Sequence, residues 1–437
     1  MLELLEDAIN DAEPIRVNGK VTRVVGTVVE GAGVGLSVGD MCRIMNRDGS
    51  SVVCEVVGFS DERVYLMPLG DITGLMPGSR IVVLGQRARV RLSSNLLGRV
   101  IDGVGNPIDG KGPLKRDVEC QLYRAAPNPF QRRRISEPLD VGVRAINSLL
   151  TVGAGQRMGI FAGSGVGKSV LLGMMARNTS ADVNVIALIG ERGREVKEFI
   201  EKDLKEEGLK RSIVVVVTSD MSPLLRVRGA FLAMTIAEHY RDQDKRVLLI
   251  MDSLTRCAMA QREIGLAVGE PPTTKGYPPS VYALLPKLLE RAGTAEGEGS
   301  ITGFYTVLVE SDDLNDPIAD ASRATLDGHI VLSRELASLG HYPAIDVLES
   351  ISRCMNDIIP EEQRDHAHRT RRVMATYRKN ADLITIGAYR DGSSATVDYA
   401  VNNIDKVNRF LTQGIDEKVD YDDSIQGMYA LNMETLN

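Results

Sequence analysis

One segment of the sequence combines closely spaced glycines with a lysine and a hydroxyl side chain. Residues 161–169 are FAGSGVGKS; they follow an apolar run and precede a helical pattern over 170–176. A glycine-rich loop between a strand and a helix is typical of a phosphate-binding (Walker A) loop. The N–H groups of the loop and the positive N-terminal end of the helix face the bound phosphate. Gly163, Gly165 and Gly167 let the backbone curl in this way. The segment predicts a nucleotide-binding site, and a turn that binds nothing is the alternative.

The last residues of this segment carry the side chains that phosphate chemistry uses. The ammonium group of Lys168 would reach the β- and γ-phosphates, and the hydroxyl of Ser169 would ligate Mg²⁺. Ala162 stands where the strict motif has its first glycine, and the looser form of the motif covers alanine. The residues expected to contact the nucleotide are Gly163, Ser164, Gly165, Val166, Gly167, Lys168, Ser169 and Val170.

Two carboxylates follow strand-like segments farther along the chain. Asp252 ends the apolar run 247–251, and an acid at the carboxyl end of a buried strand can hold Mg²⁺ through water. Glu191 follows the run 184–189 and is expected one strand over from the γ-phosphate position, where it could orient the attacking water. A surface glutamate paired with a neighbouring arginine explains Glu191 equally well from the spacing alone.

Arg353 and Tyr342 lie far along the chain from the glycine-rich loop. An arginine supplied by a neighbouring subunit can stabilise a transferring phosphoryl group, which typically contributes about 10³–10⁵ in rate. A structural role for Arg353 is the alternative. Tyr342 could pack against the base of a nucleotide or lie at an interface. His366 and His368 are interpreted as a solvated pair on a charged helix rather than as metal ligands.

A parallel sheet would have to position these residues. From about residue 150, apolar runs alternate with helical patterns, which predicts an α/β fold whose strands are buried on both faces. The preceding stretch, 96–150, is rich in glycine and proline and is expected to be an ordered connection. Within it, Arg132–Arg134 is expected to be a solvated basic run, with a subunit contact as the alternative. The expected strands lie at 157–161, 184–189, 213–218, 247–251, 303–309 and 329–333.

The two ends of the chain differ from this central part. Runs rich in Val and Ile, separated by Gly and Asp turns, predict a small N-terminal β-barrel or sandwich. Residues 1–13 have the spacing of a short amphipathic helix, with a frayed terminus as the alternative. After about residue 355 the pattern is helical; basic side chains gather over 364–379, and acidic ones gather in the tail. The expected strands of the N-terminal part lie at 21–29, 41–45, 51–57, 63–68 and 80–84.

The composition excludes several classes of protein. The chain has 437 residues, ordinary globular proportions and a net charge of −7, which argue against a generally basic nucleic-acid coat. Trp is absent and aromatic residues make up 4%, so a stacking surface for single strands is not expected. Five cysteines without CxxC spacing indicate neither a zinc site nor a disulfide framework. No apolar run approaches the roughly 20 residues that span a bilayer, so membrane association is expected only through partners.

Residues 20–430, which contain these motifs, resemble the rotary-type ATPase family, which includes the catalytic subunits of F- and V-type ATP synthases. Residues 343–352, PAIDVLESIS, are similar to that family's subunit signature, and residues 271–280 agree with it. Within the family, residues 139–153 and 161–177 most resemble the flagellar type III protein export ATPases. The injectisome secretion ATPases are similar, but less so around the phosphate-binding loop.

The resemblance implies a fold, an assembly and partners. It implies an N-terminal β-barrel, a RecA-like P-loop ATPase core and a C-terminal helical domain, with boundaries at 1–90, 91–355 and 356–437. It also implies a homo-hexameric ring with nucleotide sites at the subunit interfaces. The implied partners are a stator protein, the export gate and substrate–chaperone complexes at the cytoplasmic face of the inner membrane, and no nucleic acid.

The resemblance also implies roles for single residues. Non-catalytic ring subunits of the family have Gln at the position of Glu191, so the glutamate implies a catalytic subunit with Arg192 beside the catalytic carboxylate. The other implied roles are phosphate and Mg²⁺ binding by Lys168 and Ser169, Mg²⁺ binding through water by Asp252, donation of Arg353 to the neighbouring site, and a border to the adenine by Tyr342.

The implied function is hydrolysis of ATP, with Mg²⁺, that energises export of flagellar proteins through a type III secretion apparatus. Three alternatives stay open: an injectisome secretion ATPase, a rotary synthase catalytic subunit and an RNA-tracking RecA-like ring. The acidic balance and the sparse aromatic residues argue against the RNA-tracking ring.

Overall fold

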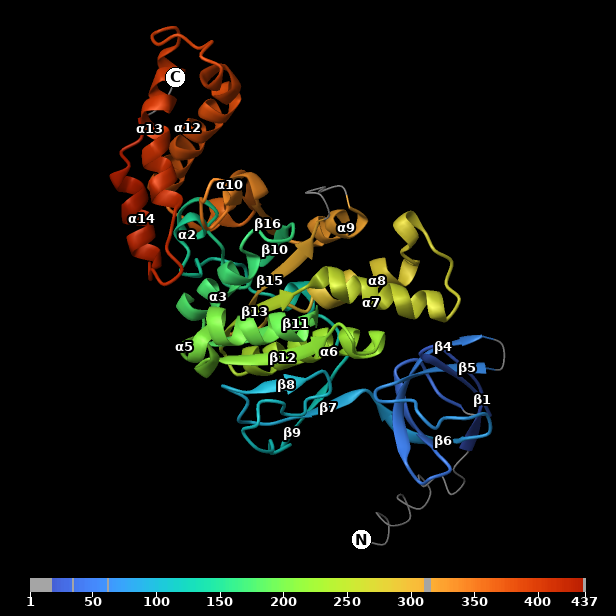
Figure 1. Cartoon of the computed structure of the whole chain (residues 1–437). Coiled ribbons are helices and arrows are strands. Elements are labelled where there is room, and N and C mark those ends of the chain that lie inside the picture. The colour runs from blue at the N-terminus through green and yellow to red at the C-terminus, as the bar shows by residue number, and fades with distance from the viewer. Residues whose placement is uncertain (1–17, 34, 61–62, 310–315, 435–437) are drawn as a thin grey trace.

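The computed structural model describes residues 18–33, 35–60, 63–309 and 316–434, and the helix expected over 1–13 lies outside them. The N-terminal part of the described chain is a closed barrel (Figure 1). Its strands, in the order in which they close, are β1 (Asn18–Val25), β2 (Val28–Ala32), β5 (Arg63–Pro68), β4 (Ser51–Ser60), β3 (Asp40–Met45) and β6 (Arg80–Arg87). The barrel expected from the sequence is confirmed.

The run at 21–29, expected as one strand, is a pair of antiparallel strands, β1 and β2. The chain turns at Gly26, whose φ of 56° lies in the left-handed region that glycine adopts without a steric penalty. Valine on both sides of this glycine hides the turn in the sequence, because the apolar pattern continues through it.

The connection that follows the barrel contributes to the sheets. β7 (Arg89–Leu92) pairs with β9 (Val118–Gln121), and β8 (Val100–Asp102) joins the edge of the large sheet beside β12. Arg132, just after the short helix η1 (Pro129–Gln131), is not part of a solvated run. Its guanidinium donates to the carbonyl oxygen of Ala292 (2.7 Å) because the connection lies against the core there. Arg133 and Arg134 form ion pairs at the surface.

The central sheet is almost entirely parallel, as expected. Its order is β17-β16-β10-β15-β13-β11-β12-β8, in which only β17 runs antiparallel to its neighbour, and the short β14 (Gly293–Thr294) pairs with β15 off this path. The other strands are β10 (Arg157–Ala162), β11 (Val183–Glu191), β12 (Ser212–Thr218), β13 (Arg246–Asp252), β15 (Ser300–Leu308), β16 (Gly328–Leu332) and β17 (Ile345–Ser352).

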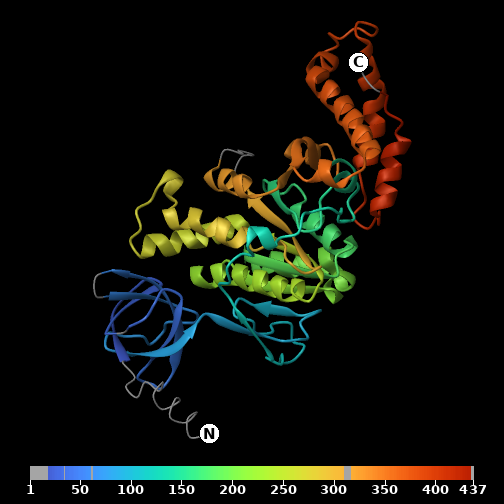
Figure 2. The ribbon, with the colours of Figure 1, turned by 180° about the vertical axis from the view of Figure 1, so that it is seen from behind.

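Helices cover both faces of this sheet, which explains why its strands are apolar throughout (Figures 1 and 2). Along β11, Val185 and Ala187 pack into one hydrophobic core, whereas Ile186 and Leu188 pack into a second core on the other face. One face carries α6 (Pro223–Arg241), α7 (Leu254–Ala267) and α8 (Pro279–Leu289). The other helices of the core are α2 (Arg144–Leu149), α3 (Lys168–Asn178), α4 (Gly193–Glu198), η2 (Phe199–Leu204), α5 (Lys205–Lys210), η3 (Thr274–Gly276), α9 (Pro317–Thr325), α10 (Arg334–Ser338) and α11 (Met355–Ile358).

Three helices form the C-terminal part and extend away from the sheet (Figure 1). They are α12 (Glu361–Thr385), α13 (Ala395–Leu411) and α14 (Tyr421–Ala430). Part of the basic cluster on α12 fixes it to β17: Arg371 donates to the carbonyl oxygen of Ser350 (3.2 Å), and Arg378 pairs with Asp346 (2.7 Å).

The histidine pair on α12 differs in part from the expectation. His368 is exposed, but the ring of His366 lies 4.6 Å from that of Tyr429 and is half-buried.

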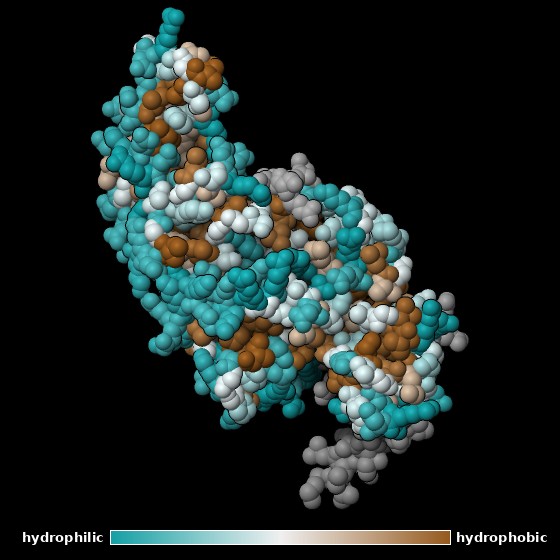
Figure 3. Space-filling model, in the orientation of Figure 1, coloured by the Kyte–Doolittle hydropathy of each residue, from teal (hydrophilic) through white to brown (hydrophobic). Residues whose placement is uncertain are grey.

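Within the described ranges, no group of three or more His, Cys, Asp or Glu side chains could hold a metal ion. None of the described helices is long and apolar enough to cross a membrane. Figure 3 shows a mostly hydrophilic face with separate apolar patches.

A buried ion pair joins the barrel to the core. Glu55 of β4 accepts from Arg228 of α6 at 3.0 Å, and both side chains are less than a tenth exposed. The hydroxyl of Tyr123, in the connection, donates to the same carboxylate at 2.7 Å. Burial raises the pKa of Glu55, although Arg228 and Tyr123 oppose this shift. The three groups therefore satisfy each other at a contact among three parts of the chain.

Candidate nucleotide-binding site

The glycine-rich loop joins β10 to α3, as the sequence predicts. Gly165 and Gly167 have φ angles of 78° and 86°, so these two glycines make the curl, whereas Gly163 is not among the residues with positive φ. The helix begins at Lys168 directly after the loop. Its first N–H groups have no partner within the helix, and with the loop they form a site for phosphate.

A cavity of about 430 Å³ lies beside this loop. It brings together residues from the ends of β10, β11, β13 and β15, because parallel strands place their carboxyl ends at one edge of the sheet. Val166, expected to contact the nucleotide, has its side chain buried in the core. The lining consists of Gly163, Ser164, Gly165, Gly167, Lys168, Ser169, Val170, Leu188, Glu191, Arg192, Glu195, Val196, Phe199, Asp252, Arg256 and Leu308.

The ammonium group of Lys168 lies between two carboxylates. It is 2.5 Å from Oδ1 of Asp252 and 3.9 Å from Oε1 of Glu191, and all three side chains are at least 86% buried. The hydroxyl of Thr306, on β15, donates to Oδ1 of Asp252 at 2.7 Å and fixes the carboxylate. One cation therefore compensates two buried acids, an arrangement that phosphates entering the cavity would rearrange.

Glu191 lies farther along the sheet than expected. Its strand β11 is not next to β10, since β15 and β13 lie between them. The order of strands is set by pairings distant in sequence, so spacing along the chain could not reveal it. Glu191 still reaches the cavity, because its side chain points toward Lys168 from the carboxyl end of β11.

The environment of Glu191 suits a proton acceptor. Burial raises its pKa to about 7, and the negative charge of Asp252 adds to this shift while Lys168 opposes it. Glu195, on α4, shares a hydrogen bond with Glu191, which lowers the pKa of Glu195. A carboxyl group with a pKa near neutrality can accept a proton and release it again near neutral pH.

The ion pair considered as the alternative for Glu191 does not form with Arg192. Arg192 donates to Glu195 instead, at 2.9 Å, and three quarters of its side chain are exposed at the mouth of the cavity. Glu191 is buried against Lys168. Arg192 is therefore at the cavity, with a side chain that can turn toward a bound anion.

Three side chains at or next to this cavity were missed from the sequence: Glu195 and Arg256 line it, and the fully buried Thr306 is hydrogen-bonded to Asp252. Arg256 lies in the first turn of α7, and no described residue accepts a hydrogen bond from its buried Nε. Gly190 makes room for it, because a β-carbon there would lie 2.8 Å from the β-carbon of Arg256. The available signal was an arginine one helical turn after the strand-ending acid. Thr306 had none, since its contact with Asp252 depends on the strand order. For Glu195 the available signal was its spacing, four residues after Glu191 at the start of a helix.

Tyr342 lies beside the phosphate-binding loop of its own chain. A β-carbon at Gly167 would come within 3.4 Å of the Tyr342 ring, and 42% of the tyrosine is exposed. The backbone N–H of Gln413 donates to the carbonyl oxygen of Tyr342 at 2.9 Å, which ties this loop to the C-terminal helices. The ring thus lies next to the loop at Gly167, although Tyr342 is not among the residues that line the cavity of about 430 Å³.

Arg353 is not brought to the site of its own chain. It follows β17, which runs antiparallel to β16, so it lies at the amino edge of the sheet, opposite the glycine-rich loop. The intervening strand β10 has six residues, a separation of about 20 Å at roughly 3.3 Å per residue. Arg353 is exposed, and no described residue pairs with its guanidinium.

The absence of Trp from the chain makes the position of Tyr342 testable. In a Tyr342→Trp variant, we expect the fluorescence of the single Trp to change saturably as nucleotide is added, because the ring would border the base. The control is Phe59→Trp, at an exposed site on the barrel, which should not respond. Tight nucleotide binding without any change in Tyr342→Trp fluorescence would contradict the placement.

Known protein families match all three parts of the chain. Residues 142–352 match the nucleotide-binding domain of the ATP synthase alpha/beta family, and residues 21–85 match the beta-barrel domain of that family. Residues 359–430 match the T3SS EscN ATPase C-terminal domain.

Individual proteins are similar over nearly the whole length. A flagellum-specific ATP synthase of Bacillus subtilis (strain 168) is 52% identical over 429 residues, which cover 98% of each chain. A type 3 secretion system ATPase of Xanthomonas euvesicatoria is 52% identical over 409 residues, which cover 93% of this chain and 92% of the relative.

Solved structures agree with the fold. The assembled ATPase EscN from the type III secretion system of enteropathogenic E. coli has a TM-score of 0.88 and 43% identity, over 94% of this chain and 99% of EscN. The assembled EscN in complex with its central stalk EscO has a TM-score of 0.86, with the same identity and coverage. The chain thus belongs to the ATP synthase alpha/beta family and is a P-loop ATPase with a C-terminal domain of the type III secretion ATPase kind.

Proposed function

We propose that this ATPase energises the export of flagellar proteins through a type III secretion apparatus. The observation that carries the proposal is the convergence of Lys168, Asp252 and Glu191 on one cavity beside the glycine-rich loop. The 52% identity with a flagellum-specific ATP synthase over 98% of both chains supports the flagellar setting.

The phosphates of ATP bind to the loop and to the start of α3. Lys168 exchanges its contact with Asp252 for the β- and γ-phosphates, which the loop N–H groups also hold. The Ser169 hydroxyl and the Asp252 carboxylate line the same cavity, and such oxygen donors suit Mg²⁺, which takes few protein ligands and completes its shell with phosphate and water. When bound, Mg²⁺ neutralises charge on the β- and γ-phosphates.

Glu191 acts on the attacking water. Its carboxylate orients the water and accepts the proton as the water oxygen forms a bond to the γ-phosphorus; the bond to ADP breaks, and ADP and phosphate are released. Arg192 and Arg256 lie at the cavity and offer donors to the charge on the transferring group. Tyr342 packs against the adenine.

In this proposal, a second copy of the chain supplies the Arg353 side chain to this nucleotide site. Arg353 is exposed at the amino edge of the sheet, so it meets a nucleotide only if that edge faces the carboxyl edge of a neighbour. A head-to-tail contact of this kind, repeated, closes into a ring. In this proposal the ring is a homo-hexamer, and the structure of the assembled ATPase EscN supports such an assembly.

The three units at 1–90, 91–355 and 356–437 have separate tasks in this proposal. The ATPase unit hydrolyses ATP, and the C-terminal helices engage substrate–chaperone complexes. A stator protein and the export gate hold the ring at the cytoplasmic face of the inner membrane. EscN has been solved with its central stalk EscO, which supports a stalk-like partner for this ring as well.

A second candidate setting is the injectisome. It is favoured by the 52% identity with a type 3 secretion system ATPase and by the EscN structures. The two settings are distinguished by expressing this chain in two bacterial strains. One strain lacks its flagellar ATPase, and the other lacks its injectisome ATPase. Restored motility and flagellin export alone support the flagellar setting, and restored effector secretion alone supports the injectisome.

Substitution at the cavity tests the ATPase site. Lys168→Ala should lose nucleotide binding together with turnover, because it removes the phosphate-binding cation. Glu191→Gln should keep nucleotide binding but lower turnover by about 10²–10⁴-fold, the usual contribution of a general base. Turnover is measured as phosphate release and binding by titration with a fluorescent nucleotide. Retention of turnover in both variants would sink the assignment.

Donation of Arg353 across the interface is tested by mixing. Arg353→Ala chains alone should lose about 10³-fold or more in turnover. Mixed one to one with Lys168→Ala chains, they should recover roughly one quarter of wild-type turnover, since about a quarter of interfaces pair an intact loop with an intact arginine. Mixtures that stay as inactive as their components would contradict donation in trans.

The pH dependence tests Glu191. Its carboxylate must be ionised to accept a proton, so kcat/KM should fall about tenfold per pH unit below a pKa near 7 and stay level above it. The charge of Glu195 contributes to the raised pKa of Glu191, so Glu195→Gln should move this limb to lower pH. An unchanged limb in Glu195→Gln, or a limb near pH 4, would contradict the assigned base.

A further inference from the structure

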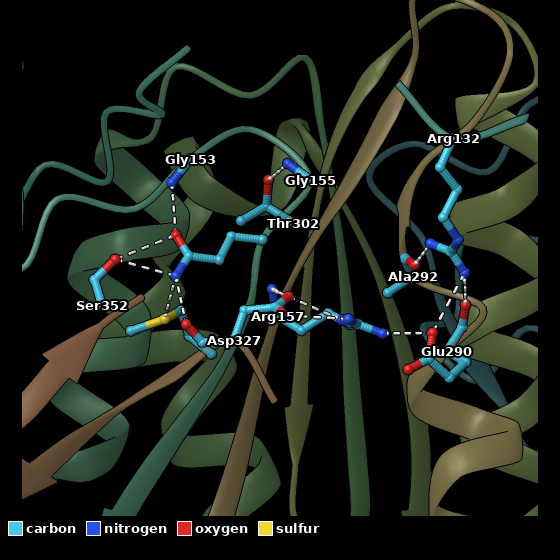
Figure 4. Close-up of polar contacts among 11 residues, drawn as sticks. Arg132, Gly153, Gly155, Arg157, Glu290, Ala292, Thr302, Asp327 and Ser352 are labelled. Atoms are coloured by element: carbon cyan, nitrogen blue, oxygen red, sulfur yellow. Dashed lines mark hydrogen bonds and ion pairs between the residues drawn. The ribbon is translucent and has the colours of Figure 1, made fainter. Parts of the chain in front are cut away.

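A polar cluster occupies the amino edge of the sheet, opposite the nucleotide cavity, and the reaction described above does not use it (Figure 4). At its centre is Arg157, the first residue of β10. Its Nε and Nη2 donate to the two carboxylate oxygens of Asp327 at 2.9 and 3.0 Å, and its Nη1 lies 2.7 Å from Glu290. The fork of the guanidinium therefore fixes the orientation of Asp327.

The same aspartate is held through its backbone. Its N–H donates to the carbonyl oxygen of Arg157 at 2.8 Å, and its own carbonyl oxygen accepts from the side-chain amide of Gln156 at 3.0 Å. Gln156 is fully buried and also donates to Oγ of Ser352 at 3.1 Å, and that hydroxyl donates to the carbonyl oxygen of Thr151 at 2.7 Å. Asp327 is thus fixed at its side chain and on both sides of its peptide backbone.

This cluster ends on Arg353. The carbonyl oxygen of Asp327 accepts a hydrogen bond from the backbone N–H of Arg353 at 3.0 Å, and Ser352 is the residue immediately before it. Gly328 brings the two segments together, since a β-carbon there would lie 2.4 Å from the carbonyl oxygen of Ile351. The backbone from which the exposed Arg353 side chain extends is therefore fixed by Asp327 and Gln156.

We propose that Asp327, oriented by Arg157, is a positioning residue for the arginine that each chain donates to its neighbour's nucleotide site. The inference rests on the proposed donation of Arg353 in trans. A long side chain can stabilise a transferring phosphoryl group only when its base is fixed, because a misplacement of about 1 Å can cost 10²-fold in rate.

A second carboxylate beside Arg157 favours positioning over a purely structural role for Asp327. The side chains of Asp327 and Arg157 are 25% and 16% exposed, and the Glu290 carboxylate lies 2.7 Å from Arg157. Arg157 therefore keeps an anionic partner when the Asp327 charge is removed, so no buried charge is left alone. Loss of the Asp327 charge should therefore change turnover far more than it changes thermal stability.

The test compares two carboxylates at the same edge of the sheet. In Asp327→Asn, we expect turnover to fall about 10- to 100-fold, with nucleotide affinity unchanged, because the chain's own loop is intact. The matched control is Asp182→Asn: Asp182 precedes β11 as Asp327 precedes β16, and its carboxylate accepts from the backbone N–H of Arg246 at 2.7 Å. The control should keep wild-type turnover. Equal turnover in the two variants would overturn the proposal.

Mixing the variant with Lys168→Ala chains then distinguishes two explanations for a loss of turnover: a misplaced Arg353 and a defect in the variant's own nucleotide site. Asp327→Asn chains mixed with Lys168→Ala chains should recover turnover, because the second chain supplies a well-placed Arg353 to the intact loop of the first. If Asp327→Asn fails to fold, Arg157→Lys, which keeps the charge and loses the fork, is mixed instead with the same expectation.

The outcomes distinguish this inference from the function on which it rests. Recovery in the mixture supports positioning. No recovery, while Arg353→Ala chains do recover with Lys168→Ala chains, overturns the role of Asp327 and leaves donation in trans intact. No recovery in either mixture overturns donation itself, and the positioning role with it.

Discussion

The direction of the strands in the central sheet is the constraint on which the rest of the structure depends. Parallel strands place their carboxyl ends at one edge, so β10, β11 and β13 deliver the glycine-rich loop, Glu191 and Asp252 to one cavity. Strand β17, which runs antiparallel to β16, carries the chain back and leaves Arg353 at the other edge. The loop, Glu191 and Asp252 thus lie at one edge and Arg353 at the other, so a single chain does not bring Arg353 to its own cavity.

In the cavity, the positive charge of Lys168 lies between two buried carboxylates. Asp252 and Glu191 are buried near each other, and Lys168 compensates both while Thr306 fixes Asp252. Burial raises the pKa of Glu191 to about 7, and the nearby charge of Asp252 adds to this shift. In the proposed reaction these features suit Glu191 to act as the base, since a carboxyl group that gives up its proton near neutral pH can accept one there.

The sequence was most informative where structure is local. The phosphate-binding loop, the apolar strands and the barrel follow from residues adjacent in the chain, and the family expected from them is confirmed. The strand order, which places two strands between β10 and β11, depends on pairings distant in sequence. For the same reason Thr306 was missed, and Arg132 was expected to be solvated although it bonds to the core. The residues that contact a side chain across the sheet cannot be predicted from the residues next to it in the sequence.

The buried pair of Glu55 and Arg228 determines how movement can pass through the molecule. Swinging the barrel away from α6 would separate Glu55 from Arg228 and break the hydrogen bond that satisfies this buried carboxylate. The contact therefore opposes a hinge between the barrel and α6, and a displacement of α6 would tend to carry the barrel with it.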